Sequence, residues 1–161
     1  MWFKLEPCEL EFAERSVHRF RNEGLINAPP ERVFGLLASD AWPEWYPDFL
    51  SVKWVTPGPH GQGSTREVKL KTLSARERFV AWEPGKRISF SIDEVTLPLI
   101  RKMMEDVRLD PAAEGKTRVV WDIHYEPRTV MRLIHPIARA IFGRMFRQAV
   151  LNLGRYVDRA S

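Results

Sequence analysis

The chain has 161 residues, of which 44% are hydrophobic and 29% are charged, and its formal net charge is +4. A chain of this length buries roughly 70% of the surface that it exposes when unfolded, so one domain can form a core without disulfides or metals. Its single cysteine, Cys8, allows no internal disulfide and no zinc-binding pair of thiols, which favours a reducing, cytoplasmic location.

Residues 1–15 are expected to form an N-terminal extension that precedes a single domain over residues 16–161. The extension begins MWFKLEPCELEF, which carries acidic and basic side chains and no long apolar run, so it lacks the pattern of a signal peptide. No stretch of the chain approaches the roughly 18 apolar residues of a membrane-spanning helix.

The domain is expected to begin with a strand over residues 16–27, in which Phe20 and Ile26 lie on one face and charged side chains on the other. A helix follows at APPERVFGLL, because proline fits the first helical turn, where its missing N–H costs nothing. The stretch AWPEWYPDF repeats this device: Pro43 can start a second short helix, and Pro47 prevents it from running on.

The middle of the chain is expected to form strands, because short alternating segments are separated by turn sequences such as EPGK and PAAEGK. These strands cover residues 51–57, 65–72, 74–82, 87–93, 102–110 and 117–127. The regular spacing of the turns indicates an antiparallel meander. The glycine-rich GPHGQG precedes a strand and not a helix, so it is interpreted as a hairpin loop and not as a phosphate-binding loop.

The C-terminal segment is different, because apolar residues recur at helical spacing from Val130 to Val157. We expect one long amphipathic helix there, with Pro136 either in its first turn or at a kink. From Thr129 onward the chain carries six arginines and one acid, Asp158. The basic face is either a solvated helix surface or a surface that touches an anionic membrane or an acidic partner.

The segment INAPPERVFGLLASDAWPEWYPDF resembles the opening signature of the START-related superfamily, also called SRPBCC. This group includes polyketide cyclase/dehydrase and lipid-transport proteins, coenzyme Q-binding proteins and proteins like the birch-pollen allergen. The segments GQGSTREVKL, VAWEPGKRISFSI and EGKTRVVWDIHYEP stand where such proteins carry their middle strands, so the resemblance covers roughly residues 16–158.

The resemblance implies an α+β helix-grip fold, in which a curved antiparallel sheet of about seven strands wraps around a long C-terminal helix, with two short helices after the first strand. It also implies a hydrophobic cavity between the sheet and the helix. Because the superfamily spans enzymes, carriers and receptors, the resemblance is specific for the fold and poor for the function.

Alternation along the strands assigns side chains to the face that is turned toward the helix. The inward set is Arg66, Val68, Leu70, Glu77, Phe79, Ala81, Ile88, Phe90, Ile92, Met103, Glu105, Val107, Leu109, Val119, Trp121, Ile123 and Tyr125. The same rule turns Asp122 and His124 outward.

Arg66 and Glu105 are ionisable residues on apolar faces. An unpaired buried charge costs several kcal/mol, so each needs a partner or a ligand. One interpretation is an internal ion pair of Arg66 with Glu105 or with Glu77, or a bend of the sheet that turns one of them to solvent. The other is a ligand site in which Arg66 meets a carbonyl or carboxylate, and Glu105 is a candidate general base.

The ligand-site interpretation has a mechanism. Aldol cyclisation of a polyketide needs a group that stabilises an enolate and a base that removes a proton next to a carbonyl. Arg66 would polarise the carbonyl, Glu105 would act as the base and Tyr125 would donate a hydrogen bond. Cyclases of the superfamily use an arginine in the pocket, but no motif ties Arg66 to it, so no catalytic residue is assigned.

In the aromatic stretch DAWPEWYPDFL, Trp42 is expected to plug one end of the fold. Trp45 and not Tyr46 is expected to face the cavity, because helical spacing puts Trp45 on one side with Phe49. The residues expected to bind a ligand are Trp45, Phe49, Arg66, Val68, Leu70, Phe79, Phe90, Met103, Glu105, Trp121, Tyr125, Phe142, Met145 and Phe146.

The four histidines are scattered without the spacing of metal ligands, so no metal is expected, and no cofactor is implied. The tryptophans follow amphipathic elements and not a basic stripe, so nucleic-acid binding is not expected. The leading hypothesis is a non-catalytic binder of a hydrophobic small molecule such as a lipid, polyketide or quinone. The alternatives are a polyketide cyclase, aromatase or dehydratase, and a lipid or quinone chaperone that docks on membrane through the arginine-rich helix. Monomer and homodimer both remain open.

Overall fold

The computed structural model describes all residues from 1 to 161. Strands dominate the first three quarters of the chain, and one long helix ends it. In chain order the elements are β1 (Phe3–Lys4), α1 (Phe12–Arg15), β2 (His18–Ile26), α2 (Pro30–Leu37), α3 (Trp42–Trp45), β3 (Phe49–Trp54), β4 (Thr65–Leu70), β5 (Ser74–Glu83), β6 (Arg87–Val95), β7 (Ile100–Pro111), η1 (Ala113–Gly115), β8 (Thr117–Pro127), η2 (Thr129–Arg132) and α4 (His135–Arg159).

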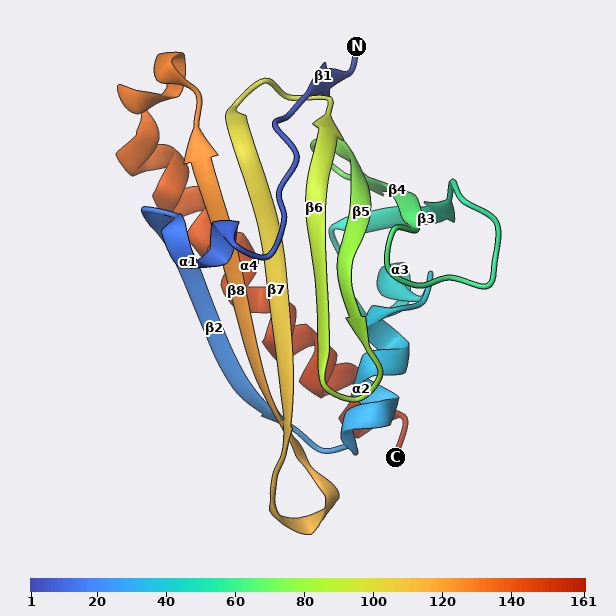
Figure 1. Cartoon of the computed structure of the whole chain (residues 1–161). Coiled ribbons are helices and arrows are strands. Elements are labelled where there is room, and N and C mark those ends of the chain that lie inside the picture. The colour runs from blue at the N-terminus through green and yellow to red at the C-terminus, as the bar shows by residue number, and fades with distance from the viewer.

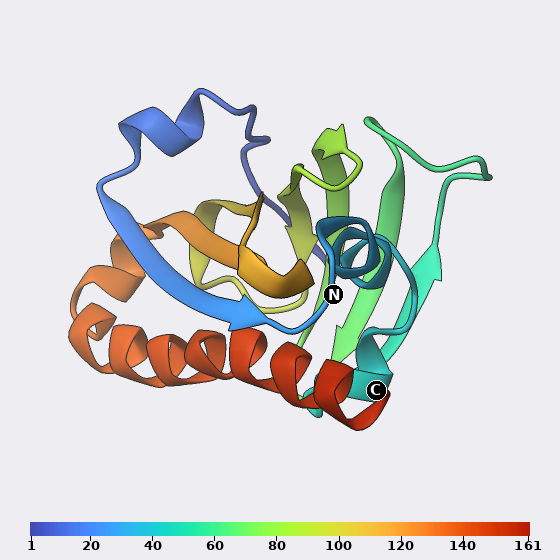
Figure 2. The same ribbon diagram turned by 90° about the horizontal axis from the view of Figure 1, so that it is seen from below.

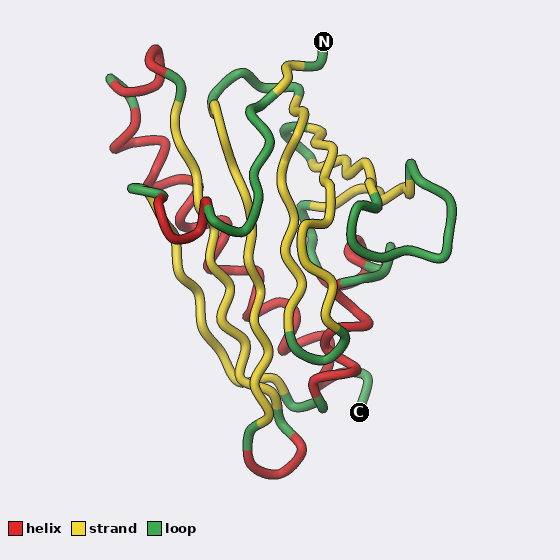
Figure 3. Tube along the Cα trace, in the orientation of Figure 1, coloured by secondary structure: helices red, strands yellow, loops and turns green.

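The strands form one antiparallel sheet in the order β2-β8-β7-β6-β5-β4-β3, and β1 pairs with one end of β6. Figure 1 shows α4 running behind the sheet from the β8 side toward α2. Seen from below in Figure 2, the sheet arches over this helix. Figure 3 shows how little of the chain outside the sheet and α4 is helical. The expected α+β helix-grip fold is therefore confirmed, with the two-residue β1 as an additional strand.

Prolines begin both short helices between β2 and β3. Pro30 lies in the first turn of α2 and Pro43 in that of α3, where no backbone N–H is needed. α3 ends after one turn, because Tyr46 precedes a proline and has an extended backbone, with φ −116° and ψ 101°. The indole Nε1 of Trp42 donates to the carbonyl oxygen of Leu37 at 3.0 Å and joins the two helices at one end of the sheet.

The C-terminal half of α4 is held tightly against β2 and the core. Ala149, Val150 and Val157 are buried along this half. Gly24 of β2 permits the approach, since a Cβ atom there would lie 2.4 Å from Cγ1 of Val150. Pro136 lies in the first turn of α4, which is the first of the two positions expected for it.

The outer face of the sheet is more buried than simple alternation suggests. Asp122 and His124 lie on the face away from α4, as expected, yet only 2% and 3% of their surfaces are exposed. Arg21 donates to both carboxylate oxygens of Asp122, and Arg108 donates to one of them at 2.6 Å. The hydroxyl of Ser16 lies 2.6 Å from Nδ1 of His124. Protein groups and not solvent therefore surround these two side chains.

A β-bulge in β5 changes one side-chain direction. Glu77 and Phe79 lie on the inward face, as expected, but Ala81 pairs with Ser89, an outward residue of β6. The bulge between Phe79 and Ala81 adds a residue to β5, so Trp82 resumes the inward face and its ring centroid lies 5.0 Å from that of Phe79. The expectation that Ala81 points inward is therefore wrong.

Candidate ligand-binding site

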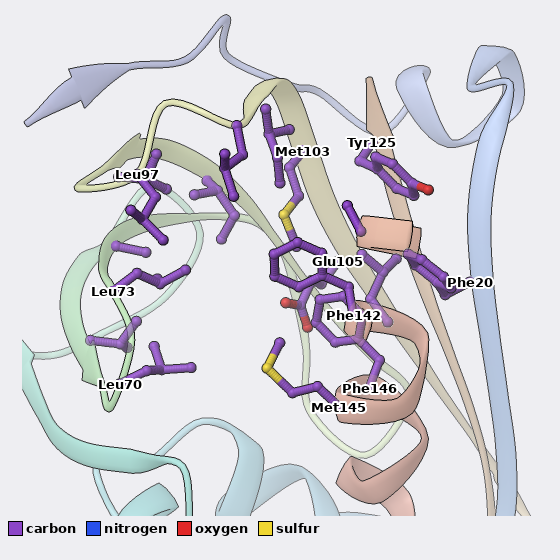
Figure 4. Close-up of a pocket in the computed structure, with 18 of the residues that line it drawn as sticks. Phe20, Leu70, Leu73, Leu97, Met103, Glu105, Tyr125, Phe142, Met145 and Phe146 are labelled. Carbon is purple, nitrogen blue, oxygen red and sulfur yellow. The ribbon is translucent and has the colours of Figure 1, made fainter. Parts of the chain in front are cut away.

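A cavity lies between the concave face of the sheet and α4. Its volume is about 110 Å³, and 23 of its 28 lining residues are hydrophobic. The wall is formed by α3, the strands β2 to β8, the connection between β6 and β7, η2 and α4. Figure 4 shows Phe142 and Met145 of α4 on one side of the space and Leu70, Leu73 and Leu97 on the other. The space is therefore lined by side chains that favour an apolar occupant.

Most of the residues that the sequence singles out for ligand binding reach this cavity. Those that line it are Phe49, Val68, Leu70, Met103, Glu105, Trp121, Tyr125, Phe142, Met145 and Phe146. Alternation along the strands and helical spacing along α4 bring them to one face. That they bind a ligand stays a prediction.

Trp45, Arg66, Phe79 and Phe90 do not line the cavity, which corrects their expected place. The guanidinium carbon of Arg66 lies 4.8 Å from the ring centroid of Trp42, 5.0 Å from that of Phe79 and 5.5 Å from that of Phe90. Trp42 lines the cavity. Arg66, Phe79 and Phe90 therefore lie behind Trp42 as seen from the cavity.

The aromatic stretch after α2 presents different residues from those expected. Trp42 and Tyr46 line the cavity, together with Phe49, and Trp45 does not. The expectation assumes that helical spacing continues from Trp45 to Phe49. It does not continue, because α3 ends at Trp45 and the backbone of Tyr46 is extended. The hydroxyl of Tyr46 donates to the carbonyl oxygen of Met145 at 2.9 Å and ties this stretch to α4.

Several lining residues escape sequence reasoning. Leu97 and Leu99 belong to the connection between β6 and β7, Phe20 belongs to β2 and Ala138 to α4. Alternation cannot assign a direction in an irregular connection. The signal that is present is compositional: the stretch VTLPLI carries no charged residue and four aliphatic ones, which is unusual for an exposed loop.

Arg66 and Glu77 form a buried ion pair. They are direct cross-strand partners on β4 and β5, and Nε of Arg66 lies 2.7 Å from Oε2 of Glu77. Nη1 of Arg66 donates to the carbonyl oxygens of Leu37 and Ser39, each at 3.2 Å. Burial raises the pKa of Glu77, and the Arg66 guanidinium opposes that rise. A guanidinium that keeps its charge and lies within hydrogen-bonding distance favours the carboxylate form of Glu77, so we assign an ionic pair at neutral pH.

Glu105 brings a carboxyl group into the cavity from β7, as Figure 4 shows. Nε1 of Trp121 donates to Oε2 of Glu105 at 2.7 Å. Burial and, next, the charge of Glu77 raise the pKa of Glu105 to about 8, while the Trp121 hydrogen bond and Arg66 oppose this rise. The carboxyl group is therefore mainly protonated at neutral pH, which makes it a hydrogen-bond donor and a poor general base.

A second polar cluster lies where the first turn of α4 meets β8. The hydroxyl of Tyr125 accepts a hydrogen bond from Nη1 of Arg139 at 2.9 Å and lies 3.0 Å from Nε2 of His135. Arg139 also donates to the carbonyl oxygen of Arg19 at 3.1 Å. Burial and then the neighbouring charges of His135 and Arg139 lower the pKa of His18. The candidates Arg66, Glu105 and Tyr125 are thus not brought together around one point, since Arg66 lies outside the cavity.

No group of three or more His, Cys, Asp or Glu side chains is placed to hold a metal ion. None of the helices combines the length and the apolar character needed to cross a bilayer. The one cysteine, Cys8, is buried, and burial raises the pKa of its thiol to about 11.

Comparison with known proteins places the chain among related sequences. The family model described as "Polyketide cyclase / dehydrase and lipid transport" matches residues 17–158. A protein of Mycobacterium tuberculosis, described as uncharacterised, is 32% identical over 157 residues, which cover 94% of this chain and 93% of that protein. Its description names no ligand and no activity.

Two solved structures share the fold. A START superfamily protein from Mycobacterium smegmatis superposes with a TM-score of 0.77 at 13% identity, over 89% of this chain and 99% of that chain. An aromatase/cyclase from a Streptomyces species superposes with a TM-score of 0.70 at 16% identity, over 89% of this chain and 96% of that chain. At these identities the likeness concerns the fold alone.

Proposed function

The chain belongs to the polyketide cyclase/dehydrase and lipid transport family, and from that membership we propose that it binds a hydrophobic small molecule in the cavity between the sheet and α4, without catalysis. The observation that carries the proposal is the cavity wall, in which 23 of 28 residues are hydrophobic. Concave, mostly apolar sites with a few polar groups are the usual form of small-molecule sites.

The polar groups of the cavity favour binding over catalysis. The one buried cation, Arg66, is occupied by Glu77 and two backbone carbonyls and lies outside the cavity wall. Glu105 is held by Trp121 with its pKa raised to about 8, so it does not offer a base at neutral pH. A cyclase of the kind outlined above needs both groups free at the substrate.

The size of the cavity sets the size of the buried part of the ligand. A volume of about 110 Å³ is of the order that accepts one small ring. A longer ligand would place one ring or chain segment here and extend toward the cluster at Tyr125 and Arg139, where Arg139 is exposed.

Filling the cavity with a larger side chain is expected to weaken the binding of a hydrophobic probe. Ala138 lines the cavity, whereas Ala140, two residues later on α4, is exposed. In an NMR titration with ethylbenzene, Ala138→Phe is expected to weaken binding by about tenfold or more, because its ring occupies the space of the probe. Ala140→Phe adds the same ring to the same helix and is expected to bind like the wild type. Equal affinities of the wild type and Ala138→Phe would contradict the proposal.

A second candidate function, docking on an anionic membrane, has an observation of its own. The turn before α4 and its first half expose a stripe of aliphatic side chains, with exposed fractions of 51% to 91%. The stripe consists of Val130, Leu133, Ile134, Ile137 and Ile141. Ile137 and Ile141, four residues apart, lie on the same side of α4, and Val130, Leu133 and Ile134 precede the helix. An amphipathic helix of this kind lies in the interface of a bilayer.

The charges beside this aliphatic stripe favour a bilayer over a second copy of the chain. No acidic residue occurs between Glu126 and Asp158, and Arg132, Arg144 and Arg147 are exposed there. Two such faces brought together would repel each other, whereas phosphatidylserine headgroups would attract them. Docking here would also bring the Arg139 end of the cavity close to the source of a hydrophobic ligand.

Vesicle sedimentation tests the docking. The wild type is expected to sediment with vesicles of phosphatidylcholine and phosphatidylserine and not with phosphatidylcholine alone. Ile137→Asp is expected to reduce sedimentation by about tenfold or more, because an inserted isoleucine contributes roughly 1.5–3 kcal/mol. Val55→Asp, which alters a comparably exposed aliphatic residue just after β3, at the opposite edge of the sheet from β2, serves as the control. Wild-type protein that ignores both kinds of vesicle, or that dimerises through this stripe instead, would overturn the docking.

A further inference from the structure

Two carboxyl groups reach the apolar wall of the cavity, and Arg66, the cation paired with one of them, does not. Glu77 and Glu105 both line it. Arg66 is fully buried, and its Nε and Nη1 donate to Glu77, Leu37 and Ser39. Its guanidinium carbon lies 4.8 Å from the ring centroid of Trp42, and its Nη2 has no hydrogen-bond partner. A ligand carboxylate placed here would meet acidic oxygens and hydrocarbon, with no positive charge to compensate its lost hydration.

The one arginine or lysine that lines the cavity is Arg139, which lies in the polar cluster with Tyr125 and His135. It donates to the hydroxyl of Tyr125 and to the carbonyl oxygen of Arg19, and it is exposed. Met103 and Tyr125 are cross-strand partners, and Glu105 lies two residues farther along β7, opposite Ile123. The surroundings of Glu105 and those of Arg139 are thus separate, and only the latter suit an anion.

The hydrogen bond from Trp121 decides which oxygen of Glu105 can donate. Oε2 accepts the indole N–H at 2.7 Å, so it acts as the carbonyl-like oxygen of the protonated carboxyl group. The proton then resides on Oε1, which takes part in no hydrogen bond with the protein, whereas Oε2 is held by Trp121. Because the carboxyl group points into the cavity (Figure 4), this O–H is aimed at the occupant.

We propose that the cavity selects an uncharged ligand whose buried end carries a hydrogen-bond acceptor, such as the carbonyl oxygen of a ketone, ester or quinone, which accepts a hydrogen bond from the Oε1–H of Glu105. This assignment rests on the proposed binding function and narrows its ligand class. It excludes molecules that must bury a carboxylate beside Glu105. A free fatty acid whose carboxylate points into the cavity is one example. An amine is the competing class, since it would take the proton of Glu105 and form a buried ion pair.

Four probes of nearly equal size separate these classes. Acetophenone offers a carbonyl oxygen, ethylbenzene offers no polar group, benzoate carries a carboxylate and benzylamine carries an ammonium group. At pH 6.5 acetophenone is expected to bind about threefold to tenfold tighter than ethylbenzene, the range of one neutral hydrogen bond. Benzoate and benzylamine are expected to bind more weakly than ethylbenzene.

Two substitutions of Glu105 test the donor. Glu105→Gln keeps an acceptor for Trp121 and an N–H donor for the ligand, so the preference for acetophenone should persist. Glu105→Leu removes the donor, so acetophenone and ethylbenzene should bind equally. Ethylbenzene binding to this variant also reports that the cavity remains folded.

The preference for acetophenone over ethylbenzene should depend on pH in the wild type and not in Glu105→Gln. The groups that act on Glu105 are Glu77 on β5, Arg66 on β4 and the hydroxyl of Tyr46 after α3, and α4 places no charged side chain beside it. Ionisation of Glu105 removes its only donor, so the advantage of acetophenone should vanish as the pH rises from 6.5 to 9. In Glu105→Gln it should stay constant.

The outcomes separate the inference from the proposed function. Binding of ethylbenzene with no preference for acetophenone, or a preference unchanged in Glu105→Leu, overturns the inference and leaves the cavity a hydrophobic site. If benzylamine or benzoate binds most tightly, the cavity selects an amine or a carboxylate, and the inference is overturned as well. If none of the four probes binds, the proposed function fails and the inference fails with it.

Discussion

Replacing Arg66 with methionine is expected to lower the free energy of unfolding by about 3–5 kcal/mol. Arg66 is 0% exposed, and its removal leaves the Glu77 carboxylate buried without a counter-charge. It also leaves the carbonyl oxygen of Ser39 without its donor, and leaves that of Leu37 with the indole N–H of Trp42 alone. These oxygens lie between α2 and α3, so the loss reaches the end of the fold that closes the cavity. Denaturant unfolding at pH 7 measures the change.

A double substitution distinguishes a broken ion pair from a simple packing defect. Arg66→Met combined with Glu77→Gln removes both charges, and it is expected to recover a large part of the lost stability, because no buried charge then remains unpaired. A loss below about 1 kcal/mol in the single variant, the level of an exposed pair, would contradict the buried-pair assignment. A double variant no more stable than the single one would contradict it as well.

Glu105→Gln is expected to stabilise the protein at high pH and to flatten its pH dependence. The pKa of Glu105 is raised from its usual value of 4.5 to about 8, so the folded chain holds a proton that the unfolded chain releases. The associated stability is fully present below about pH 4.5, declines as the pH rises and is gone above about pH 8. The slope is at most about 1.4 kcal/mol per pH unit, so the whole effect is on the order of 4 kcal/mol.

The difference between the unfolding free energies of Glu105→Gln and the wild type therefore should grow from pH 5 to pH 8 and then level off. Glu23→Gln is the matched control. The hydrogen bond from Arg118 lowers the pKa of Glu23, so its contribution changes only below its usual value. Its difference from the wild type should be flat across this range. Parallel curves for the wild type and Glu105→Gln would show that Glu105 is ionised in the folded protein at neutral pH.

Period-two alternation in the sequence is enough to assign Arg66, Glu77 and Glu105 to one face of the sheet. It cannot choose the partner of Arg66, because that choice depends on register. In the sheet Arg66 lies directly opposite Glu77 on the neighbouring strand, whereas Glu105 lies two strands farther on, opposite Phe90. The short connection between β4 and β5 sets this register.

The wrong expectations fall where a regular period stops. The prediction for Trp45 continues a helix that ends at that residue, and the prediction for Ala81 continues a strand across a bulge. Leu97 and Leu99 lie in a connection where neither period applies. The cavity wall combines such segments with regular ones, so the sequence predicts the residues of the strands and of α4 better than those of the loops.

The aromatic stretch shows the same limit at the cavity wall. Trp42, which the sequence leads us to expect only as a plug, does close the end of the fold through its bond to Leu37. The same ring also lines the cavity on one face and stacks on Arg66. One large side chain therefore has two roles, and a single sequence pattern can suggest only the first.

The most direct test of the account is to locate a bound neutral molecule by NMR. Intermolecular nuclear Overhauser effects between acetophenone and the wild-type protein are predicted to involve the side chains of Phe142, Met145 and Trp121, all of which line the cavity. They are predicted to disappear in Ala138→Phe. Effects confined to exposed aliphatic residues such as Leu133 and Ile137, or effects that persist unchanged in Ala138→Phe, would contradict the claim that the cavity is the binding site.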